Sequence, residues 1–161
     1  WGSKNWDEQS AVRMRILDWT AFFKETVLIW WNTSYSKQYE AGAANIYLGP
    51  EERGYVKALR TFTTGVESEV KMFDVAPGTE GIEALGLKSD AMLLVYFHNF
   101  ASLTEQKSAS VTLDVPFDGA AQWYSPSTGQ IVAEAAVTSG EQTLETPVFA
   151  VDLALKITAR P

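Results

Sequence analysis

From Val70 to the end of the chain, short runs of β-forming residues alternate with turn signals, and this pattern constrains the fold more than any other feature. Turn signals such as Ala76-Pro-Gly78, Asp118-Gly119 and Ser125-Pro-Ser-Thr-Gly129 separate the runs. The pattern predicts strands at 70–75, 82–88, 91–99, 109–115, 120–124, 131–137, 142–144 and 149–157. Strands spaced by roughly ten residues with turns between them predict an antiparallel β-sandwich.

Apolar and other residues alternate within several of these runs, which assigns side chains to opposite faces of a strand. In 91–99, one face carries Leu93, Val95 and Phe97, and the other carries Leu94, Tyr96 and His98. In the last strand, Val151, Leu153, Leu155 and Ile157 alternate against Asp152, Ala154, Lys156 and Thr158.

The first 66 residues have helical rather than strand periodicity. A helix is expected over 7–24, with an apolar stripe of Val12, Ile16, Trp19 and Phe23, widened by Met14 and Leu17, and with Arg13, Arg15 and Asp18 off its centre. A second helix is expected from Pro50 to about Thr64, ending at Gly65. Its expected apolar face is Tyr55, Val56, Leu59 and Phe62.

Between the two helices, residues 26–31 are continuously apolar and rich in β-branched side chains, which predicts a strand buried on both faces. A polar loop, 32–36, follows it. A single buried strand has no sheet to join, so it either packs on the β half or has neighbours in preceding polypeptide. The fold class expected is mainly β, with a helix–strand–helix segment over 1–66 and an antiparallel β-sandwich over 67–161.

Composition excludes several kinds of chemistry. The 161 residues include no cysteine and one histidine, His98, and the net charge is −7. Disulfides, thiol nucleophiles and Cys-ligated metals are excluded, a serine–histidine–acid triad has almost no room, and no metal or cofactor is expected. The negative charge argues against nucleic acids and anionic membranes as partners. The longest apolar run is too short to span a bilayer.

Hydrolysis of a glycosidic bond needs two carboxylates facing across a groove. None of the acidic candidates sits at the C-terminal end of the expected buried strand, so no catalytic residue is assigned. Glu51 and Glu52 are better explained as charges at a helix N-terminus. The other candidates are Asp7, Glu8, Asp18, Glu25 and Glu40.

Aromatic residues supply the candidate binding sites. Trp30, Trp31, Asn32 and Tyr35 lie at and just after the end of the expected buried strand, the edge at which α/β barrels bind substrate. A tryptophan there is either a sugar platform or part of the barrel wall. Trp123 and Tyr124 are interpreted first as core residues, with a secondary glycan contact as the alternative. His98 is interpreted as a partly buried sheet residue rather than a functional one.

Three groups of residues resemble a known family. Residues 13–31 resemble the seventh helix and eighth strand of a clan A glycoside hydrolase barrel, where the strand ends in tryptophan. Residues 47–62 are similar to the final barrel helix of cellulase-like and agarase-like members. Gln122-Trp-Tyr-Ser-Pro-Ser-Thr-Gly129, 146–149 and 152–157 resemble the small β-sandwich of collagen-binding type appended to such barrels.

The resemblance implies that the chain is the C-terminal portion of a retaining, polysaccharide-degrading enzyme that is extracellular or periplasmic. In that family the acid/base glutamate follows the fourth strand and the nucleophile follows the seventh, so both positions precede Trp1 and the chain is not expected to be catalytic alone. Only the tryptophan after the eighth strand carries over, onto Trp30 or Trp31. The implied partners are a polysaccharide and an N-terminal catalytic portion of the same polypeptide.

Two other functions stay open at this point. One is a free-standing carbohydrate-binding module that binds glycans through exposed aromatic rings, with Trp1, Trp6, Tyr96, Trp123 and Tyr124 as candidates. The other is a structural domain that interacts with proteins through an apolar patch.

Overall fold

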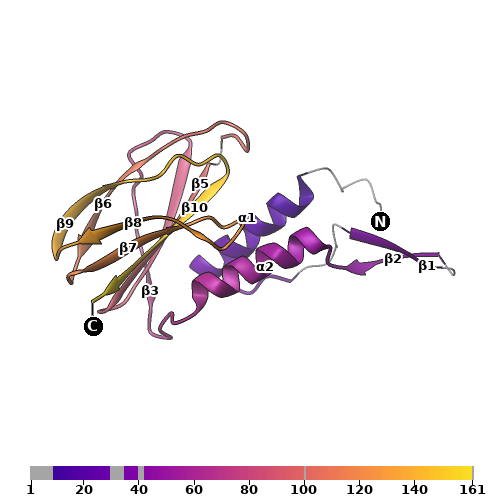
Figure 1. Ribbon diagram of the computed structural model, residues 1–161, viewed down its shortest axis with the longest axis horizontal. Coiled ribbons are helices and arrows are strands. Elements are labelled where there is room, and N and C mark those ends of the chain that lie inside the picture. The colour runs from indigo at the N-terminus through magenta and orange to yellow at the C-terminus, as the bar shows by residue number, and fades with distance from the viewer. Residues whose placement is uncertain (1–8, 30–34, 40–41, 100, 161) are drawn as a thin grey trace.

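A computed structural model describes residues 9–29, 35–39, 42–99 and 101–160 of the chain, and the fold is mainly β, as expected. The helices and the N-terminal strands are α1 (Ser10–Phe23), β1 (Tyr35–Tyr39), β2 (Gly42–Tyr47) and α2 (Pro50–Thr63) (Figure 1). The later strands are β3 (Lys71–Phe73), β4 (Ile82–Lys88), β5 (Met92–Asn99), β6 (Ser110–Val115), β7 (Gly119–Tyr124), β8 (Ile131–Val137), β9 (Gly140–Glu145) and β10 (Asp152–Ala159).

The C-terminal half forms two antiparallel sheets. The large sheet has the strand order β3-β4-β5-β10-β7-β8, and the small sheet pairs β6 with β9. The bounds of β4 and β8 agree with the prediction at both ends, and the other strands agree within three residues. The turn signals therefore located the strands, because Gly, Pro, Asp and Ser stop strand formation wherever they cluster.

The first core lies between the two sheets. Leu93, Val95 and Phe97 of β5 and Leu155 and Ile157 of β10 point into it. These side chains belong to the alternating face that the sequence predicts, and Val111, Leu113 and Val115 of the small sheet close the core from the opposite side.

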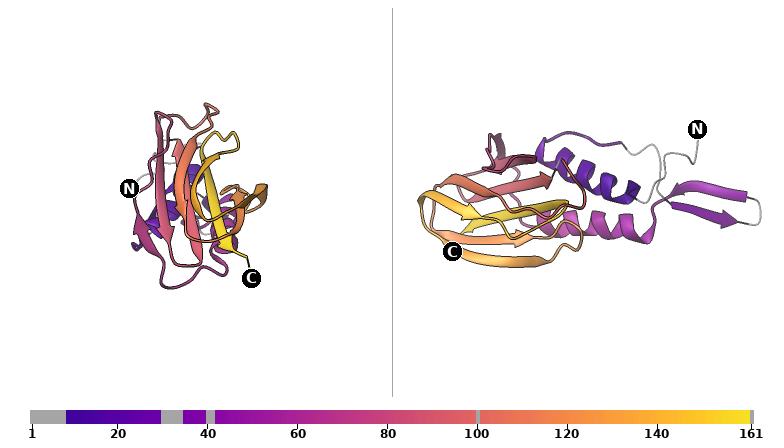
Figure 2. Two further views of the ribbon diagram at one scale, coloured as in Figure 1. Left: turned by 90° about the vertical axis from the view of Figure 1, so that its left-hand side faces the viewer. Right: turned by 90° about the horizontal axis from the view of Figure 1, so that it is seen from above.

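A second core lies on the other face of the large sheet, beneath the two helices. Trp19 and Phe23 of α1 and Phe62 of α2 pack against Leu94 and Tyr96 of β5. The Trp19 ring lies 4.8 Å from the Phe62 ring and 5.5 Å from the Tyr96 ring, between centroids. The helices therefore lie side by side against the large sheet as a third layer (Figure 2). Residues before and after position 66 share this core.

The predicted buried strand is wrong for its described residues. Residues 26–29 have no strand structure and pair with no described strand. Val27 is 84% exposed and Ile29 is 76% exposed. An apolar, β-branched run becomes a buried strand only where a sheet receives it, and the described chain offers none at this place.

A hairpin replaces part of the polar loop predicted at 32–36. The strands β1 and β2 are antiparallel, with Tyr35 opposite Tyr47 and Tyr39 opposite Gly42. Figure 1 shows the hairpin at the end of the helix pair remote from the sandwich.

The helix faces agree with the prediction only in part. Trp19, Phe23, Tyr55 and Phe62 are buried as expected, whereas Val56 is 43% exposed. The larger correction concerns Arg15, predicted to lie off the centre of the apolar stripe, which is 4% exposed.

Candidate functional site

Arg15 of α1 meets Asp152 of β10 in a buried ion pair. Arg15 Nε donates to Asp152 Oδ2 at 2.9 Å, and Arg15 Nη2 donates to Asp152 Oδ1 at 2.8 Å. Asp152 is 7% exposed. Two parallel N–H···O bonds match the planar guanidinium to the planar carboxylate, which is the strongest geometry open to such a pair.

Three more side chains complete this group, which we call the Arg15–Asp152 cluster. Tyr96 Oη donates to Asp152 Oδ2 at 3.1 Å. The Arg15 guanidinium carbon lies 4.6 Å from the centroid of the Tyr55 ring, within reach of a cation–π interaction. Tyr55 Oη in turn donates to Glu51 Oε1 at 2.6 Å. The cluster thus connects α1, α2 and two central strands of the large sheet.

The environment of the Arg15–Asp152 cluster changes the pKa values of its residues. Burial raises the pKa of Asp152, and the Arg15 guanidinium opposes that rise. Burial lowers the pKa of Arg15, but the attraction of Asp152 prevails and holds it above its ordinary value. Burial and the hydrogen bond to Glu51 raise the pKa of Tyr55 to about 12. Both carboxylate oxygens of Asp152 accept a hydrogen bond from Arg15, so the two residues titrate as a pair.

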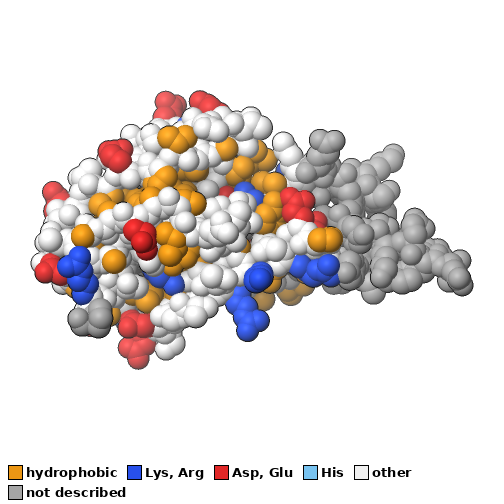
Figure 3. Space-filling view, viewed as in Figure 1, with side chains coloured by type: hydrophobic (Ala, Val, Ile, Leu, Met, Phe, Trp, Pro, Cys, Tyr) orange, Lys and Arg blue, Asp and Glu red, His pale blue; other side chains and the backbone are white. Residues whose placement is uncertain are grey.

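A hollow of about 300 Å³ lies beside this cluster, and we call it the Arg15–Asp152 hollow. Its lining consists of Arg15, Asp152, Ser125, Ser127, Val132, Leu153 and residues 147–151. The hydroxyl oxygens of Ser125 and Ser127 lie 2.8 Å apart, within hydrogen-bond distance. Figure 3 shows hydrophobic side chains lying between the sandwich and the helices on the face that it presents.

The turn that carries both serines is held against α2. Gly129 ends this turn with φ +72°, and a Cβ at this position would lie 2.9 Å from the Cα of Ala58. Only glycine meets both demands, since it accepts a positive φ and allows close backbone approach. The turn that forms this wall of the hollow is therefore packed against α2.

Two larger hollows differ in chemistry. One, of about 510 Å³, lies against Phe73 and Met72 near the end of α1. The other, of about 850 Å³, is lined by Glu67, Glu69, Lys71, Lys88 and Asp90, all of them exposed, together with Ser68, Ser89, Ala91 and Pro116. Of these three hollows, the Arg15–Asp152 hollow is the one lined by buried charged groups.

The residues predicted to bind substrate are only partly placed. Trp30, Trp31 and Asn32 lie outside the described residues. Tyr35 is the first residue of β1, opposite Tyr47. Their role at a sugar site stays a prediction.

Trp123 and Tyr124 both lie in cores of the described chain, and their alternative role as a secondary glycan contact stays a prediction. Trp123 is 4% exposed, and its ring lies 5.8 Å from that of Phe97. Tyr124 is 9% exposed and meets the Phe62 ring edge-on at 5.3 Å. Trp123 belongs to the core between the sheets, and Tyr124 belongs to the core beneath the helices.

His98 is half-buried, as expected of a sheet residue. It stacks on the Tyr96 ring at 6.5 Å with an interplanar angle of 10°. Burial lowers its pKa, and the nearby Asp152 and Glu83 carboxylates oppose this shift.

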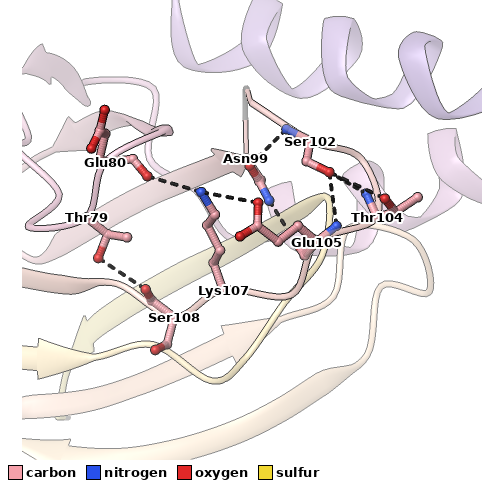
Figure 4. Close-up of polar contacts among 8 residues, drawn as sticks. All are labelled: Thr79, Glu80, Asn99, Ser102, Thr104, Glu105, Lys107 and Ser108. Carbon is pink, nitrogen blue, oxygen red and sulfur yellow. Dashed lines mark hydrogen bonds and ion pairs between the residues drawn. The ribbon is translucent and has the colours of Figure 1, made fainter.

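A second polar group shapes the loop after β5 (Figure 4). Asn99 is fully buried, and its Nδ2 donates to the carbonyl oxygen of Glu105 at 2.9 Å while its Oδ1 accepts from the Ser102 amide at 3.2 Å. Lys107 donates to the Glu80 carbonyl oxygen at 3.3 Å and pairs with the Glu105 carboxylate at 3.5 Å. These bonds hold the loop to itself and to the 79–81 turn, so their role is structural.

Within the described ranges, no three acidic or histidine side chains are grouped so that they could hold a metal ion. Neither described helix is long and apolar enough to cross a lipid bilayer.

Sequence reasoning missed the Arg15–Asp152 cluster, although two signals pointed to it. Arg15 precedes Trp19 by four residues, and this spacing puts both on one face of a helix. Asp152 and Lys156 are charged residues in a strand whose other residues, apart from Thr158, are apolar. A charge on such a strand indicates a buried partner elsewhere in the chain.

No family model matches the chain, and no curated protein matches it. Among solved structures, the chain is similar to a GH30 endoxylanase from Clostridium papyrosolvens C71, with 18% identity and a TM-score of 0.47 over 66% of this chain and 27% of that one. It is also similar to a glycoside hydrolase, with 15% identity and a TM-score of 0.44 over 68% of this chain and 25% of that one. The chain spans about a quarter of the length of these structures.

Proposed function

We propose that the chain is the C-terminal portion of a retaining, polysaccharide-degrading glycoside hydrolase, with its catalytic carboxylates in polypeptide outside it. The sandwich acts as an ancillary domain that supports the barrel. The setting is extracellular or periplasmic, by the same resemblance.

The exposure of residues 26–29 carries this proposal. Val27 and Ile29 are 84% and 76% exposed, immediately after a helix whose other face is packed on the sheet. Full burial of such a side chain contributes about 1.5–3 kcal/mol relative to leaving it in water. Residues 26–29 have no strand structure in this chain, and their exposed apolar side chains favour burial against polypeptide outside it. The resemblance identifies the run with the eighth strand of a barrel, which would form when neighbouring barrel strands receive it.

The exposed apolar side chains of the two helices also support the proposal that a barrel packs against this chain. Trp19 lies in the helix–sheet core, whereas Leu17 is 46% exposed and lies about 200° away around α1. Val56 of α2 is likewise exposed. Both helices thus carry apolar side chains outside the face packed on the sandwich, as helices between a sandwich and a barrel require.

Two described carboxylates near the helices are already engaged, and this supports placing the chemistry outside the chain. Asp152 is held by Arg15, and Glu51 accepts a hydrogen bond from Tyr55. Retaining hydrolysis needs one carboxyl that gives up a proton and one free to attack the sugar. Trp30 and Trp31, which follow residues 26–29, are proposed as the sugar platform at the barrel mouth.

The free-standing module stays the alternative. Among the residues whose side-chain exposure the structure describes, the exposed large apolar side chains are Leu17, Val27, Ile29, Val56, Met72, Ile131, Val132 and Val148, and none of these is aromatic. Two of the rings proposed for a module, Trp1 and Trp6, lie outside the described residues.

Native mass spectrometry of the protein purified from its source tests the proposal. We expect the 17.8 kDa sequence within, or bound to, a larger species that releases sugars from a polysaccharide with retention of anomeric configuration, read by NMR. A lone 17.8 kDa species under native and denaturing conditions would refute it.

A paired variant tests the strand directly. In the larger species, the double substitution Val27→Asp and Ile29→Asp should abolish association or activity. Met72→Asp, at another exposed apolar position, is the matched control and should leave both unchanged. Equal behaviour of the two variants would contradict the assignment of residues 26–29.

A further inference from the structure

We propose that the Arg15–Asp152 hollow binds a sugar residue of a neutral glycan, at a place separate from the hydrolytic site. The choice of a glycan as ligand rests on the proposed function, whereas the geometry of the hollow stands apart from it.

The polar floor of the hollow suits a hydroxyl group. A hydroxyl both donates and accepts, and here a guanidinium and a carboxylate lie side by side and buried. Two of the five N–H donors of Arg15 point at Asp152, and the carboxylate accepts three hydrogen bonds of about four that it can take. Arg15 therefore has N–H groups beyond the two bound to Asp152, and the carboxylate can accept about one further hydrogen bond, so the pair can both donate to and accept from sugar hydroxyls.

Two serine hydroxyls in the lining add groups that can both donate and accept hydrogen bonds. The Ser125 and Ser127 hydroxyls lie in contact with each other at the edge of the hollow, and each can exchange that contact for a sugar hydroxyl. The Gly129 contact with Ala58 fixes this turn, so little order is lost when a ligand binds.

The wall supplies apolar surface for the C–H face of a sugar ring. Val132 is 51% exposed and Val148 is 64% exposed, and Pro147 lies beside Val148 in the lining. These side chains give the hollow an exposed apolar wall beside its polar floor. The volume of about 300 Å³ is at the lower end of the range for small-ligand sites, which fits one ring or two.

The charge balance selects a neutral sugar over an acidic one. The Arg15 charge is matched by Asp152 within the same floor, so the hollow offers no unpaired cation. The net charge of −7 on the chain adds repulsion against a uronate or a sulfated sugar.

Titration of the 161-residue chain by NMR tests the proposal. The ¹⁵N-labelled protein is titrated separately with cellohexaose, xylohexaose and mannohexaose, each up to about 10 mM, a range that detects millimolar dissociation constants. We expect at least one of them to shift the amides of Ser125, Ser127 and Val148 saturably.

Variants locate the site. The double substitution Ser127→Ala and Val148→Asp should weaken binding by about fivefold or more, because it removes one hydroxyl contact and charges the apolar wall. The matched control, Ser68→Ala and Met72→Asp, lies outside the hollow and should leave the affinity unchanged. Thermal unfolding of both variants confirms that they fold.

Three results would overturn the proposal: no saturable shift with any of the three sugars, shifts confined to residues outside the hollow, or equal weakening in the control. Hydrolysis by the larger species is measured separately. Binding without hydrolysis removes the proposed function and leaves this site standing, whereas hydrolysis without binding removes this site alone.

Discussion

Lys156 of β10 donates a hydrogen bond from Nζ to the main-chain carbonyl oxygen of Thr64, 3.1 Å away, just after the last residue of α2. The same Nζ lies 5.1 Å from the Phe62 ring centroid and 5.8 Å from that of Tyr124. Asp152, on the same face of the same strand, holds α1 through Arg15. A single strand in the middle of the large sheet therefore fastens both helices.

Breaking the buried ion pair should be costly. Asp152→Ala leaves the Arg15 guanidinium buried without its carboxylate, and we expect a loss of about 3–5 kcal/mol in the free energy of unfolding. The double variant Arg15→Met and Asp152→Leu should recover much of this loss, because no unpaired charge remains. Urea unfolding followed by circular dichroism measures both, with the exposed Glu141→Ala as control. A loss below about 1 kcal/mol for Asp152→Ala would show that the pair is not buried in solution.

His98 should make the protein less stable in mild acid. Its pKa is lowered by burial, so the unfolded chain binds a proton more readily than the folded one. The stability that His98 contributes is therefore present above its unfolded pKa of about 6.5 and is lost as the pH falls through that value toward the folded pKa. Because the chain has one histidine, His98→Gln should flatten the slope of unfolding free energy between about pH 7.5 and 5.5. An unchanged slope in this variant would assign the effect to carboxylates instead.

Two glycines form a matched pair for the contact between the β7–β8 turn and α2. Gly129 and Gly65 have nearly equal φ values of +72° and +75°, but an added Cβ meets Ala58 at Gly129 and no atom within 4 Å at Gly65. Gly65→Ala should cost about 1–2 kcal/mol from backbone strain alone. Gly129→Ala should cost more by about 1–3 kcal/mol, since backbone must also move. Equal costs in thermal unfolding would mean that the turn is not packed on the helix.

The sandwich should not be stable without the helices. Removing 1–66 exposes Leu94 and Tyr96 to water and leaves Asp152 and Lys156 without their helix partners. We expect 67–161 to aggregate or to lack a cooperative unfolding transition. Size-exclusion chromatography and calorimetry beside the 161-residue chain measure this. Cooperative unfolding of 67–161 near the temperature of the full chain would contradict the shared core and favour the free-standing module.

The sandwich could be predicted from the sequence because its determinants are local. Turn residues bound β4 and β8, and alternation assigned the two faces of β5 and β10. Arg15 and Asp152 could not be paired in this way: the local sequence indicates that each is buried, but they are 137 positions apart and nothing in the sequence identifies one as the partner of the other. The prediction of a buried strand at residues 26–29 failed for a related reason. Their composition indicates a strand, but their burial depends on a sheet that the described chain does not provide.

The order of β10 in the chain has a consequence for biosynthesis. During translation α1 and α2, with Trp19 and Arg15, emerge before the sandwich, and β10, which receives Arg15, is made after the other described strands. The core beneath the helices is complete only after β10 has been synthesised. Until then the apolar faces of α1 and α2 are exposed in the nascent chain, where aggregation competes with folding. A premature stop codon anywhere before Asp152 would therefore prevent the packing of α1 and α2 as well as the formation of the complete large sheet.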